Sequence, residues 1–131
     1  MKPVADNQTR SPLGRAIGLG SAKEGVEHWW RGRVTAVALI PLALWFVASV
    51  IAHSADGYGE FVAWLKTPVV TFMMILLLIA LFYHVALGLQ VIIEDYVHSA
   101  AKIPALVLTR LACFGFLAAG ILAVFRIVFD Y

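Results

Sequence analysis

The chain has 131 residues, of which 62% are hydrophobic and 14% are charged, and its formal net charge is +2. Soluble domains carry about 25% charged residues, so a chain with this few polar groups is expected to be a membrane protein. The single cysteine, Cys113, excludes an internal disulfide, a c-type haem attachment motif and a self-contained iron–sulfur centre. It is expected to be a small buried apolar side chain.

Residues 1–33 form a polar segment ahead of the first apolar run. This segment lacks the continuous apolar core of a signal peptide, and its Gly and Ser content predicts a loop that leads to a short helix around residues 23–30. Trp29 and Trp30 are placed to anchor the chain at the membrane interface. The first apolar run, residues 34–53, contains Pro41, which is expected to kink its helix.

Two further apolar runs follow, at residues 69–94 and 103–129. Each of the runs is long enough to cross about 30 Å of hydrocarbon, which takes about 20 helical residues. In lipid only a helix or a closed barrel satisfies the backbone polar groups. The predicted fold class is therefore an all-α integral membrane protein, with an N-terminal segment of residues 1–33 and a three-helix transmembrane domain of residues 34–131.

Basic residues are concentrated on one side of these helices. The segment before the first apolar run contains Lys2, Arg10, Arg15, Lys23, Arg31 and Arg33. The loop of residues 54–67 has only Lys66. The positive-inside rule then places the N-terminus and the second loop in the cytoplasm, or in the matrix of an organelle. The sequences "RGR" at 31–33 and "EDYVH" at 94–98 consequently share one membrane face.

His84 is the one histidine of the four that falls at membrane depth, roughly 15 Å from the cytoplasmic end of its helix. An ionisable group at that depth is costly and by default marks function. It can be a neutral imidazole that hydrogen-bonds another helix, or an axial ligand of haem iron. Ala80 and Gly88 extend a stripe of small residues beside it, which lets a flat macrocycle or a helix approach. A haem held by two histidines would need a second subunit, because His53 belongs at the opposite membrane face.

Polar residues end the second apolar run. Asp95 follows His84 by 11 residues, about three turns, and so lies on nearly the same helix face. Tyr96 offers a phenol at the membrane surface. Taken alone these residues are more typical of a polar helix end, and Arg31 and Arg33 of positive-inside topology. Beside a haem or quinone, the arginines can instead pair with haem propionates or with Asp95.

Two segments, "GSAKEGVEHWWRGRVTAVALIPLALWF" and "FYHVALGLQVIIEDYVH", carry a resemblance to a known family. With the spacing His-x10-Asp-Tyr and the "R-x-T-A" of residues 33–36, they resemble the hydrophobic membrane-anchor subunit of succinate dehydrogenase, respiratory complex II. The resemblance covers most of the chain after about residue 19. It implies half of a heterodimeric bundle that shares haem b, with His84 as the iron ligand. It further implies that Tyr96 hydrogen-bonds ubiquinone, that Asp95 lies beside the quinone, and that Arg33 supports the haem and quinone region.

The resemblance also implies partners and a location. The expected partners are a second anchor subunit of the cytochrome b556 type, an iron–sulfur subunit, a flavoprotein subunit and the lipid membrane, without nucleic acid. The chain would dock these subunits for ubiquinone reduction by succinate while holding no catalytic residue of its own. The expected location is the bacterial inner membrane, multi-pass, with a cytoplasmic N-terminus. Two alternatives stay open: a fumarate reductase anchor, and a haem-free structural or assembly subunit.

Overall fold

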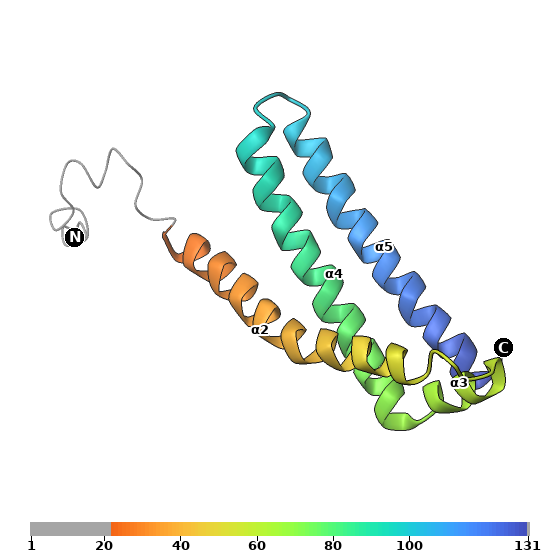
Figure 1. Cartoon of the computed structure of the whole chain (residues 1–131). Coiled ribbons are helices and arrows are strands. Elements are labelled where there is room, and N and C mark those ends of the chain that lie inside the picture. The colour runs from red at the N-terminus through yellow and green to blue at the C-terminus, as the bar shows by residue number, and fades with distance from the viewer. Residues whose placement is uncertain (1–21, 131) are drawn as a thin grey trace, which may run out of the picture. The chain divides into compact units, whose positions relative to one another are not determined.

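A computed structural model describes residues 22–130, which form four helices (Figure 1). Labelled as in Figure 1, they are α2 (Ala22–Ala52), α3 (Tyr58–Leu65), α4 (Pro68–Tyr96) and α5 (Lys102–Phe129). The described residues contain no strand, which confirms the all-α prediction. The chain divides into two compact units, Met1–Arg31 and Gly32–Tyr131, and α2 runs through their boundary.

Three of the helices are long and apolar enough to cross a membrane: Gly25–Ala52 within α2, α4 and α5. They correspond to the three predicted spans. Helices α4 and α5 begin and end within two residues of the predicted positions. Helix α2 differs, because residues 23–30 are continuous with it and not a separate helix. No proline interrupts the chain between Ala22 and Pro41, and the helix also continues through Pro41.

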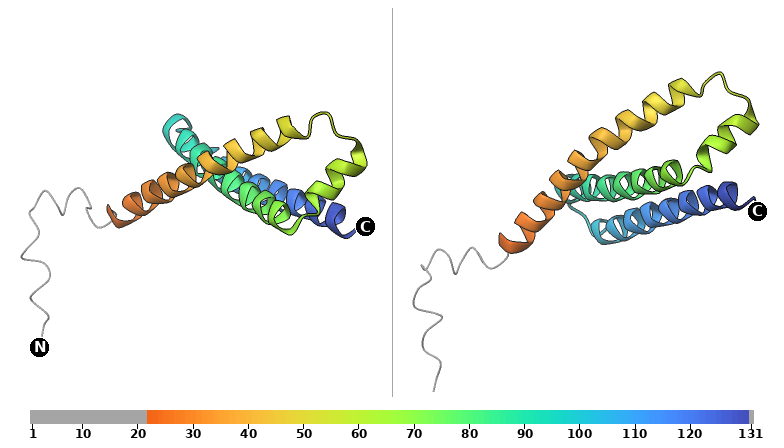
Figure 2. Two further views of the ribbon diagram at one scale, coloured as in Figure 1. Left: turned by 60° about the horizontal axis from the view of Figure 1, so that its bottom comes forward. Right: turned by 90° about the horizontal axis from the view of Figure 1, so that it is seen from below.

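Helices α4 and α5 pack side by side as an antiparallel hairpin joined by residues 97–101 (Figures 1 and 2). Leu77 on α4 and Val124 on α5 are buried, as is Cys113, which confirms the expectation for the cysteine. At Gly120 the helices come close together, because a Cβ there would lie 3.2 Å from Cδ1 of Leu78. A small residue at this point lets α5 contact the α4 side chains directly.

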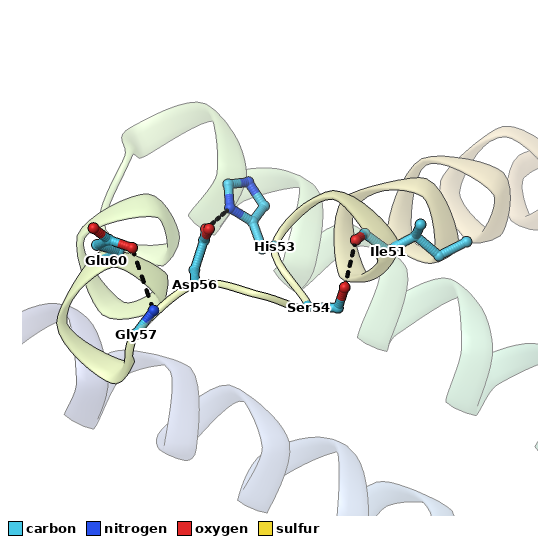
Figure 3. Close-up of polar contacts among 6 residues, drawn as sticks. All are labelled: Ile51, His53, Ser54, Asp56, Gly57 and Glu60. Atoms are coloured by element: carbon cyan, nitrogen blue, oxygen red, sulfur yellow. Dashed lines mark hydrogen bonds and ion pairs between the residues drawn. The ribbon is translucent and has the colours of Figure 1, made fainter.

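The loop that was predicted between the first two spans contains a helix that the sequence analysis missed, α3. Figure 3 shows how the chain enters it: the Ser54 hydroxyl donates to the Ile51 carbonyl over 2.8 Å, and the Glu60 carboxylate accepts from the Gly57 N–H over 3.2 Å. His53 pairs with Asp56 in the same turn. These local hydrogen bonds reverse the chain between α2 and α3.

Aromatic and charged contacts join α3 to its neighbours. The Trp64 ring lies 4.5 Å from the His53 ring and 6.4 Å from the Trp45 ring, measured between centroids. Lys66, just after α3, forms an ion pair with Asp130 at the end of α5. This end of the bundle is therefore held by contacts between segments that are far apart in the sequence.

Very little of the described chain is buried within itself. The buried apolar side chains are Leu42, Leu65, Leu77, Cys113 and Val124, and no polar or charged side chain of the described residues is fully buried. Large apolar side chains are exposed on all three long helices. Surfaces of this kind require lipid or other subunits to cover them.

Candidate functional site

The half-buried His84 on α4 is tied to α2 by a hydrogen bond. Its Nδ1 lies 3.0 Å from the hydroxyl oxygen of Thr35. The same hydroxyl oxygen lies 3.1 Å from the carbonyl oxygen of Gly32, one turn earlier on α2. The interhelical hydrogen bond that the sequence left open as one role for His84 is therefore present, and it occupies one of the two ring nitrogens.

The other ring nitrogen of His84, Nε2, has a different environment. It makes no hydrogen bond to the described side chains of residues 25–130, and those residues do not enclose it. A neutral imidazole whose Nδ1 carries the proton presents an unshared electron pair at Nε2. In a hydrocarbon environment such a polar atom is costly unless a donor or a metal occupies it.

The surface next to His84 is open, as a flat ligand requires. Gly88, one turn later on α4, is exposed, and a Cβ there would meet no atom within 4 Å. Gly32 on α2 is half-buried, and a Cβ there would likewise meet no atom within 4 Å. Residues 25–130 contain no group of three His, Cys, Asp or Glu side chains able to hold a bare metal ion. Haem needs only an axial nitrogen and a flat space from the protein, so the residues present fit haem and not a protein-caged ion.

Asp95 and Tyr96 end α4 and are both exposed, Tyr96 with 81% of its surface accessible. Within the described part of the chain, neither side chain has a hydrogen-bond or ion-pair partner. Both groups are thus available to a ligand or a partner subunit. They lie about 16–18 Å along the helix from His84, so the structure does not bring them into contact with the imidazole.

A network of polar side chains near Asp95 and Tyr96 was not predicted from the sequence. A guanidinium nitrogen of Arg110 on α5 donates to the Gln90 amide oxygen over 2.8 Å, and the Gln90 amide nitrogen donates to the Glu94 carboxylate over 2.8 Å. The ammonium of Lys102 donates to the Glu94 carbonyl over 3.1 Å. The network joins α4 to α5 and includes a hydrogen bond to the Glu94 carboxylate. Of the two neighbouring acids, Asp95 is the one without a side-chain partner in the described chain.

The two arginines of the predicted site lie on α2. Arg31 pairs with Glu27 one turn earlier, within the first unit. Arg33 has an exposed side chain and lies two residues before Thr35. Their roles toward a haem or a quinone stay predictions.

Thr35 was quoted only as one letter of the "R-x-T-A" signature, and its contact with His84 was missed. The two residues are 49 positions apart, so no local spacing could reveal the contact. The available signal was a hydroxyl side chain within an apolar helix. A polar group at that position needs a partner, and His84 was the one histidine expected at similar depth.

Comparisons with known proteins support the resemblance. Residues 7–124 match the family model described as succinate dehydrogenase/fumarate reductase transmembrane subunit. The succinate dehydrogenase hydrophobic membrane anchor subunit of Rickettsia bellii is 34% identical over 88 residues, covering 67% of this chain and 70% of the relative. The protein of the same name from Paracoccus denitrificans is 30% identical over 116 residues, covering 88% of this chain and 90% of the relative.

A third relative with that name, from Rickettsia conorii, is 26% identical and covers 88% of this chain and 94% of its own length. No solved structure matches the chain significantly. The match to the family model covers the first two membrane-spanning helices and most of the third, and the relatives cover most of both chains. The chain belongs to the succinate dehydrogenase/fumarate reductase transmembrane subunit family, as a multi-pass membrane anchor.

Proposed function

We propose that this anchor subunit supplies one axial ligand of haem b, through Nε2 of His84. The observation that carries the proposal is the difference between the two ring nitrogens. Nδ1 is hydrogen-bonded to Thr35, while Nε2 has no hydrogen-bond partner and is not enclosed within the described chain. When bound, haem b would supply one-electron redox chemistry. The second axial ligand would come from a second anchor subunit, since His53 is paired with Asp56 in the turn before α3.

The exposed end of α4 is the proposed ubiquinone site. The Tyr96 phenol would donate a hydrogen bond to a quinone carbonyl and stabilise the charge that develops on that oxygen. Reduction to the quinol also takes up two protons, and Asp95 can deliver them from water because its carboxylate is exposed and unpaired in the described chain. Arg33, with Arg31, would pair with the negatively charged haem propionates or support the quinone site.

The proposed assembly follows from the charge distribution. In the sequence, most Lys and Arg residues precede the first span, and the positive-inside rule would place them, together with the loop that follows Asp95 and Tyr96, on the cytoplasmic face of a bacterial inner membrane. The flavoprotein and iron–sulfur subunits would dock there, because electrons from succinate must reach the quinone on that side. The exposed apolar faces of the helices would contact lipid and the second anchor subunit of the cytochrome b556 type.

A haem-free structural role is the second candidate, and the hydrogen bond between Thr35 and His84 favours it as directly as haem binding does. The test is the reduced-minus-oxidised optical spectrum of the purified complex, normalised to its protein content. His84→Leu should remove or shift the b-type bands, whereas the matched control His98→Gln, in the exposed second loop, should leave them intact. An unchanged spectrum in the assembled His84 variant would contradict the ligand assignment.

Direction of catalysis needs its own measurement, because the family includes fumarate reductases. The complex should oxidise succinate with ubiquinone faster than it reduces fumarate with a quinol. A faster fumarate reduction would favour the fumarate reductase anchor.

A further inference from the structure

The contact between Thr35 and His84 carries an inference that rests on the proposed haem function but concerns a different residue. This side-chain hydrogen bond joins α2 to α4, and it lies within the apolar length of both helices. His84 is 12 residues from the end of α4, about 18 Å along the helix. A hydrogen bond at that depth is not exchanged for water, so its geometry constrains both partners.

The protons in this contact can be assigned by elimination. A threonine hydroxyl has one proton and two acceptor lone pairs, and a carbonyl oxygen can only accept. The Thr35 oxygen lies 3.1 Å from the Gly32 carbonyl and 3.0 Å from His84 Nδ1. Both contacts are hydrogen bonds only when the hydroxyl donates to the backbone of α2 and accepts from an Nδ1–H group. The opposite assignment leaves two acceptor oxygens facing each other.

In the neutral imidazole, this assignment leaves Nε2 without a proton. A neutral imidazole with its proton on Nδ1 has a lone pair on Nε2, which is the form that binds a metal. The bond also restrains the rotation of the ring, because the hydroxyl is itself tied to the α2 backbone. The Nε2 atom would otherwise be protonated for part of the time and unable to bind iron.

We propose that Thr35 is a positioning residue for haem: its hydroxyl oxygen accepts the Nδ1–H of His84, fixes the tautomer and orients Nε2 toward the iron. Thr35 acts through His84 and does not touch the haem iron itself. Ligand histidines commonly have such a partner for their second nitrogen, and replacing the partner costs about 10- to 100-fold in metal affinity. A hydrogen bond to Nδ1–H also makes the imidazole a stronger donor, which favours ferric iron.

The first test uses the purified complex with Thr35→Val, which keeps the shape of the side chain and removes the hydroxyl, and Thr35→Ser, which keeps the hydroxyl. Thr35→Val should retain haem about 10- to 100-fold more weakly and raise the midpoint potential of the b-type haem. Thr35→Ser should stay close to the wild type in both measurements. An unchanged potential and haem content in Thr35→Val, or an equal loss in both variants, would overturn the role of the hydroxyl.

The second test needs no haem. Nitrogen-15 NMR of the full chain in lipid bilayers, labelled at histidine and prepared without haem, reports the tautomer of each ring, and the His84 signals are assigned by their loss in His84→Gln. The Nδ1–H form should dominate in the wild type and give way to a mixture in Thr35→Val. An Nε2–H form in the wild type would overturn the inference.

The two proposals fail separately. Normal haem spectra in His84→Leu would refute the ligand role of His84, and the NMR result would still decide whether Thr35 fixes the tautomer. Loss of haem in His84→Leu together with wild-type behaviour of Thr35→Val would retain the ligand and refute the positioning role.

Discussion

The close approach of α4 and α5 at Gly120 makes a stability prediction with a matched control. A Cβ at Gly120 would lie 3.2 Å and 3.3 Å from the two terminal carbons of Leu78. Favourable contacts between carbons lie at about 3.5–4.0 Å, so an added side chain must displace Leu78 or separate the helices. A Cβ at Gly115, on the same helix, would meet nothing within 4 Å. Substitutions at these two glycines therefore differ mainly in the contact with Leu78.

The expected loss in the free energy of unfolding follows from the size of the added side chain. Adding carbons to a packed interface costs about 1–3 kcal/mol. Because the contact is with the flexible end of Leu78, Gly120→Ala should be only about 1 kcal/mol less stable than Gly115→Ala, at the low end of that range. Gly120→Val adds two further carbons and should be about 2 kcal/mol less stable than Gly115→Val. Each comparison cancels the change in helix propensity, which is shared by the two sites.

The assay is unfolding of the full chain in mild detergent, titrated with a denaturing detergent and followed by circular dichroism. The free energy of unfolding of the Gly120 variants should fall below that of the Gly115 variants in the order Ala, then Val. Leu78→Ala should recover part of the loss in Gly120→Val, because it removes the atoms in conflict. Equal stabilities for Gly120→Val and Gly115→Val would refute the described packing of α4 against α5.

Three further predictions concern polar side chains. Tyr96→Phe should lower quinone reduction by the complex about 3- to 10-fold, the cost of one hydrogen bond, while succinate oxidation by an artificial acceptor stays unchanged; equal losses in both assays would refute a quinone role. A double-mutant cycle of Arg110→Met and Gln90→Leu, read by unfolding, should give a coupling of about 0.5–1.5 kcal/mol, and zero coupling would contradict the contact. Asp130→Asn should change the unfolding free energy by less than about 1 kcal/mol, because the Asp130 carboxylate that pairs with Lys66 is exposed, and a larger loss would contradict that exposure.

The membrane-spanning helices could be predicted because lipid imposes a minimum apolar length, and residues 69–94 and 103–129 meet it between polar ends. The same criterion could not find the start of α2. The first turns of α2 are polar. Whether they form a helix depends on hydrogen bonding along the local backbone and not on the length of an apolar run. Helix α3 was missed because Tyr58–Leu65 is far shorter than a membrane span, and the bond between Gly57 and Glu60 at its start is local.

The candidate site divides in a similar way. His84 could be identified from the sequence because one imidazole in a long apolar run is unusual by itself. Asp95 and Tyr96 could be placed at an exposed helix end, where the structure also has them. Thr35 and the link between Arg110 and Gln90 could not be predicted, because each joins two different helices. Contacts of that kind depend on how the helices pack, which no single helix pattern encodes.

The most direct test of the central claim is a cryo-electron microscopy map of the assembled complex at a resolution that orients the His84 ring. We predict that Nε2 of His84 is bonded to haem iron, that a histidine of a second subunit lies on the opposite face of the porphyrin, and that Nδ1 is still hydrogen-bonded to the Thr35 hydroxyl. A map with the His84 ring facing acyl chains or another helix, and no porphyrin beside it, would contradict the account.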